Sequence, residues 1–343
     1  MKRVGLLGLP QSGKSTVFEV ILQGAGVEAK TASGKETIGV VEVPDERVDR
    51  LSALYSPKST VRSRVQFVDT VAASSQGKPS KGPDLFASVR NCDALVGVVR
   101  EFDTDAAAAR RDLGNLQAEL ILNDLALVET RRERIEKELR IGKKQNEREH
   151  ALLVRFHEAL EAEKPLRGLT LDAEEEKLVR GFQLLTMKPL LVVYNQGEAG
   201  QAPPAADEAH IAAVGLKALL EREVLGLPAG ERGGFRAELG LGEDGLTTVI
   251  RACFELLGLI SFFTVGEDEV RAWELSKGAT AVDAAGEIHS DLAKGFIRAE
   301  VIPYDKLLEV GGEKGARERG WLRLEGRDYV VQDGDCLNIR FNR

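Results

Sequence analysis

The sequence has few cysteines and no long apolar run. Its three cysteines, Cys92, Cys253 and Cys336, are widely spaced, so they form neither a short-spaced metal-ligand pair nor an even set for disulfides. This pattern favours a reducing compartment. The apolar run near the N-terminus is far too short to cross a bilayer, and no longer one follows. We therefore expect a cytoplasmic protein with no membrane partner.

An excess of positive charge is also absent. The 343 residues include 47 Lys and Arg against 55 Asp and Glu, a formal net charge of −8. This balance argues against wholesale nonspecific binding of nucleic acid, although it is compatible with a local basic patch. A chain of this length exceeds the usual size of one domain, so we expect two or three domains.

A glycine-rich loop near the N-terminus is the clearest motif in the chain. The apolar stretch "RVGLLGL" (3–9) predicts a strand, and it runs directly into "GLPQSGKS" (8–15) and then into "TVFEVIL", whose apolar residues have helical spacing. All fixed positions of the pattern G-x-x-x-x-G-K-[ST] are present, in the strand–loop–helix context that this motif requires. The sequence therefore predicts a P-loop, which binds nucleotide phosphates.

The residue types of this loop suit phosphate chemistry. Gly8 and Gly13 let the backbone turn its N–H groups toward phosphate oxygens, and the helix N-terminus adds a favourable dipole. Lys14 places a positive charge at the β- and γ-phosphates. Ser15 can offer its hydroxyl to Mg²⁺, which we predict as the cofactor.

Further strands are predicted at 61–69, 93–102 and 188–195, which are rich in apolar residues typical of buried strands. The first of them ends in Asp69, where a P-loop protein carries the aspartate on the Mg²⁺ side. An aspartate after a strand is commonly a turn residue or a helix cap. Because a complete P-loop precedes it, we favour Asp69 as a metal ligand.

A helical segment separates the predicted strands at 93–102 and 188–195. Ile121, Leu125, Val128, Ile135 and Leu139 form an apolar seam with alternating spacings of four and three, broken only at Arg132. Two more helical patterns follow at 151–160 and 174–185. We predict an inserted helical hairpin or coiled-coil arm. Its seven Lys and Arg between 131 and 144 could contact RNA, but interleaved acidic residues favour a solvated helix face.

The pattern of the C-terminal part predicts a small mixed sheet packed against one helix. The helix is expected at 279–289, and we interpret His289 as a helix-end residue rather than a catalyst. The turn "QDGD" predicts a hairpin between the last two strands. The expected strands are 269–275, 294–302, 328–332 and 336–341.

Three stretches together resemble the YchF, or Obg-like ATPase, family: "GLPQSGKST", "NQGE" (195–198) and above all the long run from "VRAWELSKGATAVDAAGEIH" to "DCLNIRFN". The resemblance implies an α/β fold with a P-loop NTPase G domain of the translation-factor type. It further implies an inserted helical coiled-coil domain and a C-terminal ubiquitin-like TGS domain, a β-grasp fold. The domain boundaries that we predict are 1–115 with 186–266 for the G domain, 116–185 for the insertion and 267–343 for the TGS domain.

The family resemblance also implies a ribosome-associated ATPase that binds ATP rather than GTP. Guanine displays two donors that an aspartate carboxylate accepts together, whereas adenine displays one donor and one acceptor. By position, Asn195 and Glu198 are expected to contact the base. The predicted catalytic and metal-binding residues are Lys14 with Asp69, and Ser15 with Asp69. The predicted nucleotide-binding residues are Gly8, Pro10, Gln11, Ser12, Gly13, Lys14, Ser15, Thr16, Asn195 and Glu198.

Two regions depart from the family pattern. Ala72 stands where the D-x-x-G motif after the strand-end aspartate has its glycine. The stretch "KTASGKETIGV" (30–40) lacks the usual Pro-Phe-x-Thr pattern, which leaves either Ser33 or Thr37 as the substitute for a Mg²⁺-binding threonine. These departures concern the segments that support hydrolysis and leave the P-loop motif complete.

The sequence leaves three functions open. The first is a slow ATPase that acts with the ribosome or its large subunit, with RNA contact through the helical and TGS domains. The second is a nucleotide-dependent ribosome-binding module with little or no turnover, and the third is a GTP-preferring GTPase of the translation-factor type. In each case we expect a monomer.

Overall fold

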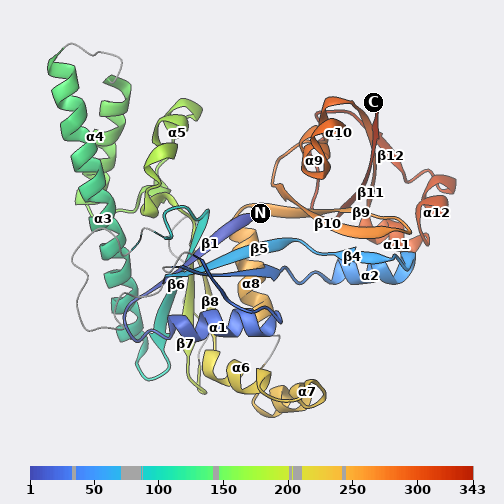
Figure 1. Ribbon diagram of the computed structural model, residues 1–343, viewed down its shortest axis with the longest axis horizontal. Coiled ribbons are helices and arrows are strands. Elements are labelled where there is room, and N and C mark those ends of the chain that lie inside the picture. The colour runs from blue at the N-terminus through green and yellow to red at the C-terminus, as the bar shows by residue number, and fades with distance from the viewer. Residues whose placement is uncertain are drawn as a thin grey trace. The chain divides into compact units, whose positions relative to one another are not determined.

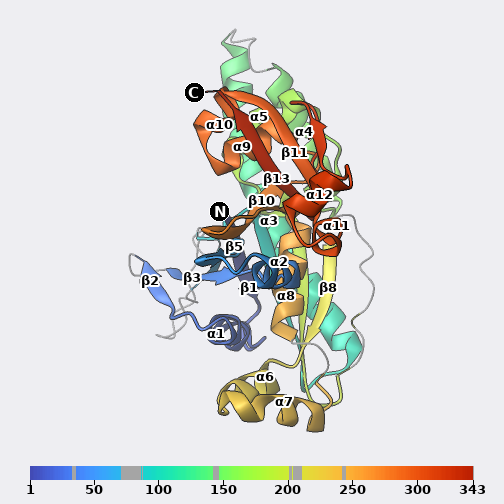
Figure 2. The same ribbon diagram turned by 90° about the vertical axis from the view of Figure 1, so that its right-hand side faces the viewer.

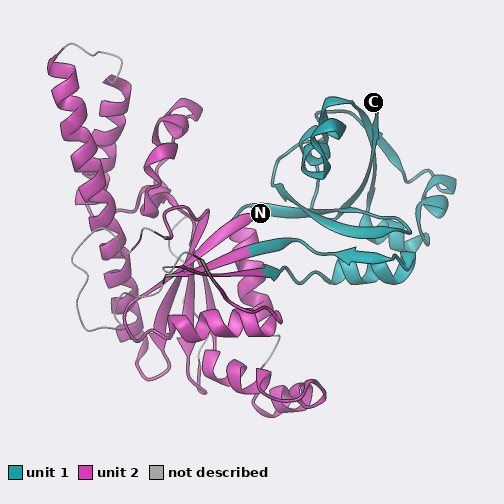
Figure 3. Cartoon of the chain, viewed as in Figure 1, with its two compact units in different colours: residues 1, 41–65, 257–343 teal, residues 2–40, 66–256 magenta. Residues whose placement is uncertain are grey.

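The computed structural model describes residues 1–32, 36–70, 86, 88–141, 147–200, 203, 211–241 and 245–342. The chain divides into two compact units (Figure 3). The smaller one contains residues 1, 41–65 and 257–343, and the larger one contains residues 2–40 and 66–256. Neither unit is one continuous segment, because the chain passes from the larger to the smaller unit at residue 41 and returns at residue 66. The boundaries of the three predicted domains stay predictions.

A seven-stranded sheet forms the centre of the larger unit, with the strand order β2-β3-β5-β1-β6-β7-β8 (Figure 1). The strands from β1 through β6 and β7 to β8 are parallel, whereas β2 and β3 pair antiparallel. The parallel order confirms the predicted α/β class, since such strands need crossover connections. The strands are β1 (Lys2–Gly8), β2 (Lys30–Ala32), β3 (Glu36–Glu42), β5 (Arg64–Thr70), β6 (Ala94–Glu101), β7 (Leu190–Gln196) and β8 (Ile211–Leu216).

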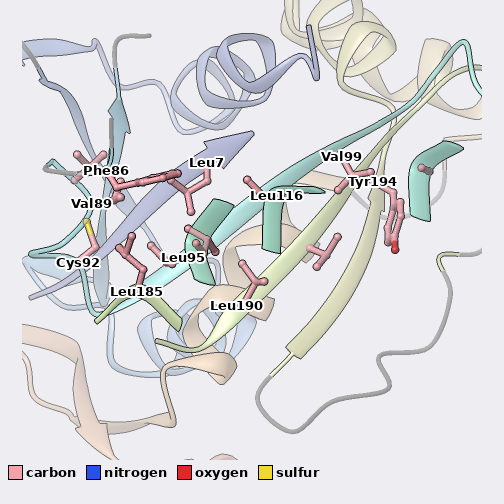
Figure 4. Close-up of a cluster of buried hydrophobic side chains, with 14 residues drawn as sticks. Leu7, Phe86, Val89, Cys92, Leu95, Val99, Leu116, Leu185, Leu190 and Tyr194 are labelled. Carbon is pink, nitrogen blue, oxygen red and sulfur yellow. The ribbon is translucent and has the colours of Figure 1, made fainter. Parts of the chain in front are cut away.

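Helices cover this sheet and extend beyond it. The helix α3 (Ala106–Arg140) packs with its first half on the sheet, where Leu116 meets Leu95 and Leu190 (Figure 4). Its second half pairs with α4 (Glu147–Glu161), and the two helices lie side by side in Figures 1 and 2. The other helices of this unit are α1 (Lys14–Gly24), α5 (Ala173–Val179), α6 (Ala218–Leu225), α7 (Ala229–Glu238) and α8 (Gly245–Leu256), with 3-10 turns at Leu166–Gly168, Arg180–Phe182 and Leu185–Met187.

The predicted helical insertion is confirmed in its core. Ile121, Val128 and Ile135 are buried against α4, and Leu125 and Leu139 pack partly buried beside them. These are the five residues of the apolar seam. A seam of this spacing forms a stripe along one side of a helix, so a second apolar helix is needed to cover it.

A six-stranded sheet forms the smaller unit, in the order β12-β11-β13-β9-β10-β4. One face holds α9 in an apolar cluster, and the other face holds α2, α11 and α12. The expected mixed sheet that grips a helix is therefore confirmed. The elements are α2 (Glu46–Tyr55), β4 (Ser59–Val61), β9 (Leu259–Thr264), β10 (Glu269–Ser276), α9 (Ala281–Ile288), α10 (Ser290–Lys294), β11 (Phe296–Pro303), α11 (Tyr304–Glu309), α12 (Glu313–Glu318), β12 (Arg323–Glu325) and β13 (Asp335–Phe341).

The expected hairpin of strands 328–332 and 336–341 is wrong. Residues 328–332 form only an isolated bridge between Val330 and Thr280, while β13 pairs antiparallel with β11. The backbone around Val330 instead bonds to the start of α9: Ala281 N donates to Tyr329 O at 2.8 Å, and Val331 N donates to Ala279 O at 3.1 Å. His289, as expected, lies at a helix end, where its Nδ1 accepts a hydrogen bond from Asp291 N at 3.2 Å.

Residues 41–65 belong to the smaller unit, whereas the predicted nucleotide-binding domain of residues 1–115 and 186–266 includes them. Arg47 of α2 forms salt bridges with Asp45 and with Asp333, and its Nη1 lies 2.7 Å from Asp333 Oδ2. Tyr55 Oη accepts a hydrogen bond from Glu313 N at 3.2 Å, and β4 pairs parallel with β10. The segment between β3 and β5 is therefore a structural part of the C-terminal sheet. No helix of the described residues is both long and apolar enough to cross a membrane.

Candidate functional site

The predicted P-loop connects β1 to α1 with a backbone that requires glycine. β1 ends at Gly8, and Gly13 is the N-cap of α1 with φ of 82°. This left-handed conformation is costly for residues with a Cβ. A Cβ at Gly13 would also collide with the side-chain amide of Asn195. Gln11 has a positive φ as well, 65°. The loop thus turns sharply and leads its backbone into the N-terminus of α1, a geometry suited to an anion.

Lys14 and Asp69 meet beside this loop. Lys14 Nζ donates a hydrogen bond to Asp69 Oδ1, and each side chain is only 11% exposed. Burial raises the pKa of Asp69, and the nearby charge of Lys14 opposes that rise. Lys14 at the start of α1 and Asp69 near the end of β5 therefore form an ion pair that is largely shielded from solvent. The structure brings together the two residues for which we predict catalytic roles.

Asn195 joins the "NQGE" segment to the P-loop. It lies at the end of β7 and is 5% exposed, and its Nδ2 donates a hydrogen bond to Ser12 O at 3.1 Å. Ser12 is buried too, and its hydroxyl lies where a Cβ at Gly8 would clash. Sequence reasoning predicted Asn195 and Ser12 as parts of one site. The structure adds that a direct hydrogen bond between them connects the P-loop to the end of β7.

A pocket of about 1030 Å³ opens between these loops. Its lining comes from the P-loop, from the turn between β6 and α3, from the "NQGE" segment and from α6. This volume lies at the upper end of the usual range for small-molecule sites. Among the predicted nucleotide-binding residues, the pocket lining includes Gly13, Thr16, Asn195 and Glu198. Glu198 is exposed, so its carboxylate can rotate toward a ligand.

Several predicted residues do not line the pocket. Pro10, Gln11 and Ser15 are exposed, with Ser15 in the first turn of α1. Thr37 is half-buried in β3, paired with Thr31 of β2. The alternative Ser33 and the altered position Ala72 lie outside the described residues.

The lining residues that sequence reasoning missed include Glu101, Phe102 and Leu219. Glu101 and Phe102 stand at the carboxyl end of a predicted parallel strand, where ligands bind in open α/β sheets, so that rule could have found them. Leu219 lies in α6, which no pattern predicted. Phe102 and Leu219 are large apolar side chains that are 42% and 54% exposed. They are suited to cover the faces of a planar base.

Two of the predicted residues, Asp69 and Ser15, fit a Mg²⁺ ion. Asp69 supplies a carboxylate and Ser15 a hydroxyl, and Mg²⁺ prefers such hard oxygen ligands. The described part of the chain holds no group of three or more His, Cys, Asp or Glu suited to a metal. Since Mg²⁺ commonly binds through one or two protein ligands together with phosphates and water, this sparse donor set suits it.

Comparison with known proteins places these features in a family. Residues 259–342 match the family model YchF-GTPase_C, described as "Protein of unknown function (DUF933)". A curated protein of Bacillus subtilis (strain 168), "Ribosome-binding ATPase YchF", is 40% identical over 362 residues, covering 98% of both chains. This chain belongs to the YchF family. The ribosome-binding ATPase YchF of Escherichia coli O157:H7 is 38% identical, and the match covers 99% of both chains.

Solved structures agree with this assignment. The Schizosaccharomyces pombe YchF GTPase superposes with a TM-score of 0.80 at 27% identity, covering 99% of this chain and 97% of that one. A GTP-binding protein from Pyrococcus horikoshii OT3 covers both chains fully, with a TM-score of 0.61 at 21% identity, which supports the fold alone. The predicted P-loop NTPase fold and the family resemblance are thereby confirmed. The relatives in the YchF family are named both as an ATPase and as a GTPase.

Proposed function

We propose that the chain binds ATP with Mg²⁺ in this pocket, hydrolyses it slowly to ADP and phosphate, and acts in association with ribosomes in the cytoplasm. The observation that carries the proposal is the direct bond from Asn195 to the backbone of the P-loop, because it joins a base-reading segment and a phosphate-binding loop around one pocket. The names of the bacterial relatives, which are ribosome-binding ATPases, support the ATPase activity and the partner.

At the phosphate end, each residue has a definite task. The P-loop amides and Lys14 bind the β- and γ-phosphates and stabilise the negative charge that develops during transfer. Ser15 and Asp69 would hold Mg²⁺, which supplies further neutralisation of phosphate charge when bound. Water attacks the γ-phosphorus, the bond from this phosphorus to the β,γ-bridging oxygen breaks, and ADP leaves with the electron pair.

A nucleotide-dependent binding module with little turnover is the second candidate. Ala72 favours it, because a glycine there would allow loop conformations that a Cβ restricts. Single-turnover hydrolysis measured with and without ribosomes separates the two candidates. Phosphate release that follows ATP binding supports the ATPase, and tight ATP binding without release under both conditions supports the module.

The base preference is the first testable expectation. We expect tighter binding of ATP than of GTP, and we expect Glu198→Asp to shift the preference toward GTP, because an aspartate at this place can accept both donors of guanine. Titration of each variant with both nucleotides measures this ratio. Glu223→Asp is the matched control, since it shortens another exposed carboxylate of the same pocket. Equal or stronger binding of GTP by the native protein contradicts the expectation.

Ribosome association is the second expectation. The basic stretch of α3 is largely paired with carboxylates: Arg131 with Glu149 at 2.7 Å, and Arg134 with Glu138 at 3.4 Å. These pairs weaken the case for RNA contact there. We therefore expect the smaller unit to make the main contact, so that Arg298→Glu, on the exposed side of β11, weakens cosedimentation with ribosomes or large subunits.

The control for this experiment is Arg134→Glu, an equal charge reversal on α3. Removal of residues 267–343 is a poorer test, because Val48 and Leu51 of α2 are buried in the same cluster as Leu307 and Ala316. Loss of binding only in the Arg134→Glu variant would move the contact to α3. A native chain that never cosediments would rule out the ribosomal partner.

A further inference from the structure

Glu101 lines the pocket at the end of β6. In the parallel register of β6 and β7 its Cα is the partner of Gln196, the residue after Asn195. Glu101 and Gln196 both line the pocket, beside Asn195 and Glu198. Glu101 is half-buried and Gln196 is buried. A carboxylate thus lies next to the segment for which we predict contact with the base.

Gln196 holds this carboxylate in one orientation. Its Nε2 donates a hydrogen bond to Glu101 Oε2 at 2.7 Å. Its Oε1 faces Gly200 and Gly215, where a Cβ would come within 2.6 and 2.5 Å of that oxygen. Glycine at these two positions therefore leaves the room that the amide occupies. Since a carboxylate oxygen only accepts hydrogen bonds, the NH₂ end of Gln196 must face Glu101.

The other carboxylates of the pocket are engaged differently. Asp105 caps α3 by accepting from Ala108 N at 2.7 Å, and Asp103 lies 3.4 Å from Arg100. Glu198 and Glu223 are exposed. Within the described part of the chain, Glu101 has no cationic partner, and the described lining contains no Lys, Arg or His. Glu101 is therefore an acceptor held in the pocket by a neutral amide.

We propose that Glu101, positioned by Gln196, is a second residue that determines base specificity, by reading position 6 of the purine. The proposal rests on the nucleotide-binding function proposed above and deepens it. A carboxylate accepts a hydrogen bond from the 6-amino group of adenine. Against O6 of guanine the same oxygen faces another acceptor, and neither is satisfied. Discrimination between the bases then does not depend on Glu198 alone.

The native protein provides the first test, through inosine triphosphate (ITP). ITP carries O6 and N1–H as GTP does but lacks the 2-amino group, so a comparison with ATP removes any contribution of that group and leaves only the difference at positions 6 and 1. We expect ITP to bind at least about tenfold more weakly than ATP, as expected when a polar group in a site loses its partner. Titrations of ATP, ITP and GTP in the presence of Mg²⁺ measure this. ITP binding equal to that of ATP overturns the proposal.

The second test is Glu101→Gln, which offers an amide donor to O6. We expect the ATP-to-ITP affinity ratio to fall about tenfold toward equality. Glu223→Gln is the matched control, because it removes the same charge from the α6 side of the pocket and should leave the ratio unchanged. Gln196→Leu keeps a similar side-chain volume but removes the hydrogen bond that positions Glu101. We expect the ATP-to-ITP affinity ratio of this variant to fall less than that of Glu101→Gln.

The outcomes separate this inference from the proposed function. A native chain that binds ATP tightly, with a ratio that Glu101→Gln does not alter, overturns the role of Glu101 and leaves the ATP-binding function standing. An equal change in the Glu223→Gln variant attributes the effect to net charge and also overturns it. A native chain that binds no nucleoside triphosphate contradicts both the function and the inference.

Discussion

Lys14→Ala is expected to lower kcat/KM for ATP by at least about 10²-fold, the loss typical when a group that stabilises transition-state charge is removed. Lys14 is the only residue of the motif with a full positive charge, and its Nζ contacts Asp69 beside the loop. The substitution also removes the cation that opposes the burial-induced rise in the pKa of Asp69. Both effects weaken the binding of Mg²⁺ and nucleotide.

The measurement combines nucleotide titration with single-turnover hydrolysis. Lys58→Ala is the matched control, because Lys58 is a highly exposed lysine of the smaller unit, paired with Asp268. It should bind and hydrolyse ATP as the native protein does. Activity retained by Lys14→Ala would show that this loop is not the phosphate site. Circular dichroism shows whether Lys14→Ala still folds. If it does not, Lys14→Met replaces it in the experiment, because methionine keeps the packing of the side chain and removes only the charge.

Asp124→Ala is expected to lower the free energy of unfolding by about 3 to 5 kcal/mol, the range for breaking one side of a buried charged pair. Asp124 is fully buried on α3. Its oxygens accept hydrogen bonds from Leu185 N at 3.0 Å and from the backbone and hydroxyl of Thr186, each at 2.7 Å. Arg90 lies 3.9 Å away. The substitution leaves these donors without their acceptor.

Denaturant unfolding measures this difference. Glu119→Ala, an exposed change on the same helix, is the control and should shift stability by less than about 0.5 kcal/mol. An Asp124→Ala variant as stable as the native protein would show that the donors find other acceptors. We also expect Asp124→Ala to weaken nucleotide binding, because Leu185 and Thr186 precede β7, which carries Asn195.

The pH dependence of this difference has a definite sign. Burial raises the pKa of Asp124, with hydrogen bonds from Thr186 and Leu185 and the charge of Arg90 opposing the rise. A carboxyl group whose pKa is higher in the folded state costs stability above that pKa, and the cost is relieved as the pH falls through it. The alanine variant lacks this term. The stability gap between native protein and variant is therefore expected to widen on acidification.

The local signals were read correctly from the sequence, because they depend on residues close together in the chain. The turn before α1 needs glycine for its left-handed φ, which the motif displays directly. The apolar seam of α3 predicts its own burial, since spacing alone sets which residues share a helix face. Asp69 and Asn195 could be placed at the ends of buried strands by the same kind of reasoning.

Pairings between distant segments were decided only by the tertiary structure. The segment 328–332 satisfies its backbone at the start of α9 rather than in a hairpin, and residues 41–65 join the C-terminal sheet. Glu101 and Gln196 form a pair because β6 and β7 are in register over seven residue pairs. Strand register depends on which apolar faces meet in the folded core, and one residue of slip would reverse every face. The sequence by itself therefore determined the glycine-rich loop and the class of fold, whereas the tertiary structure decided which side chains line the pocket beside it.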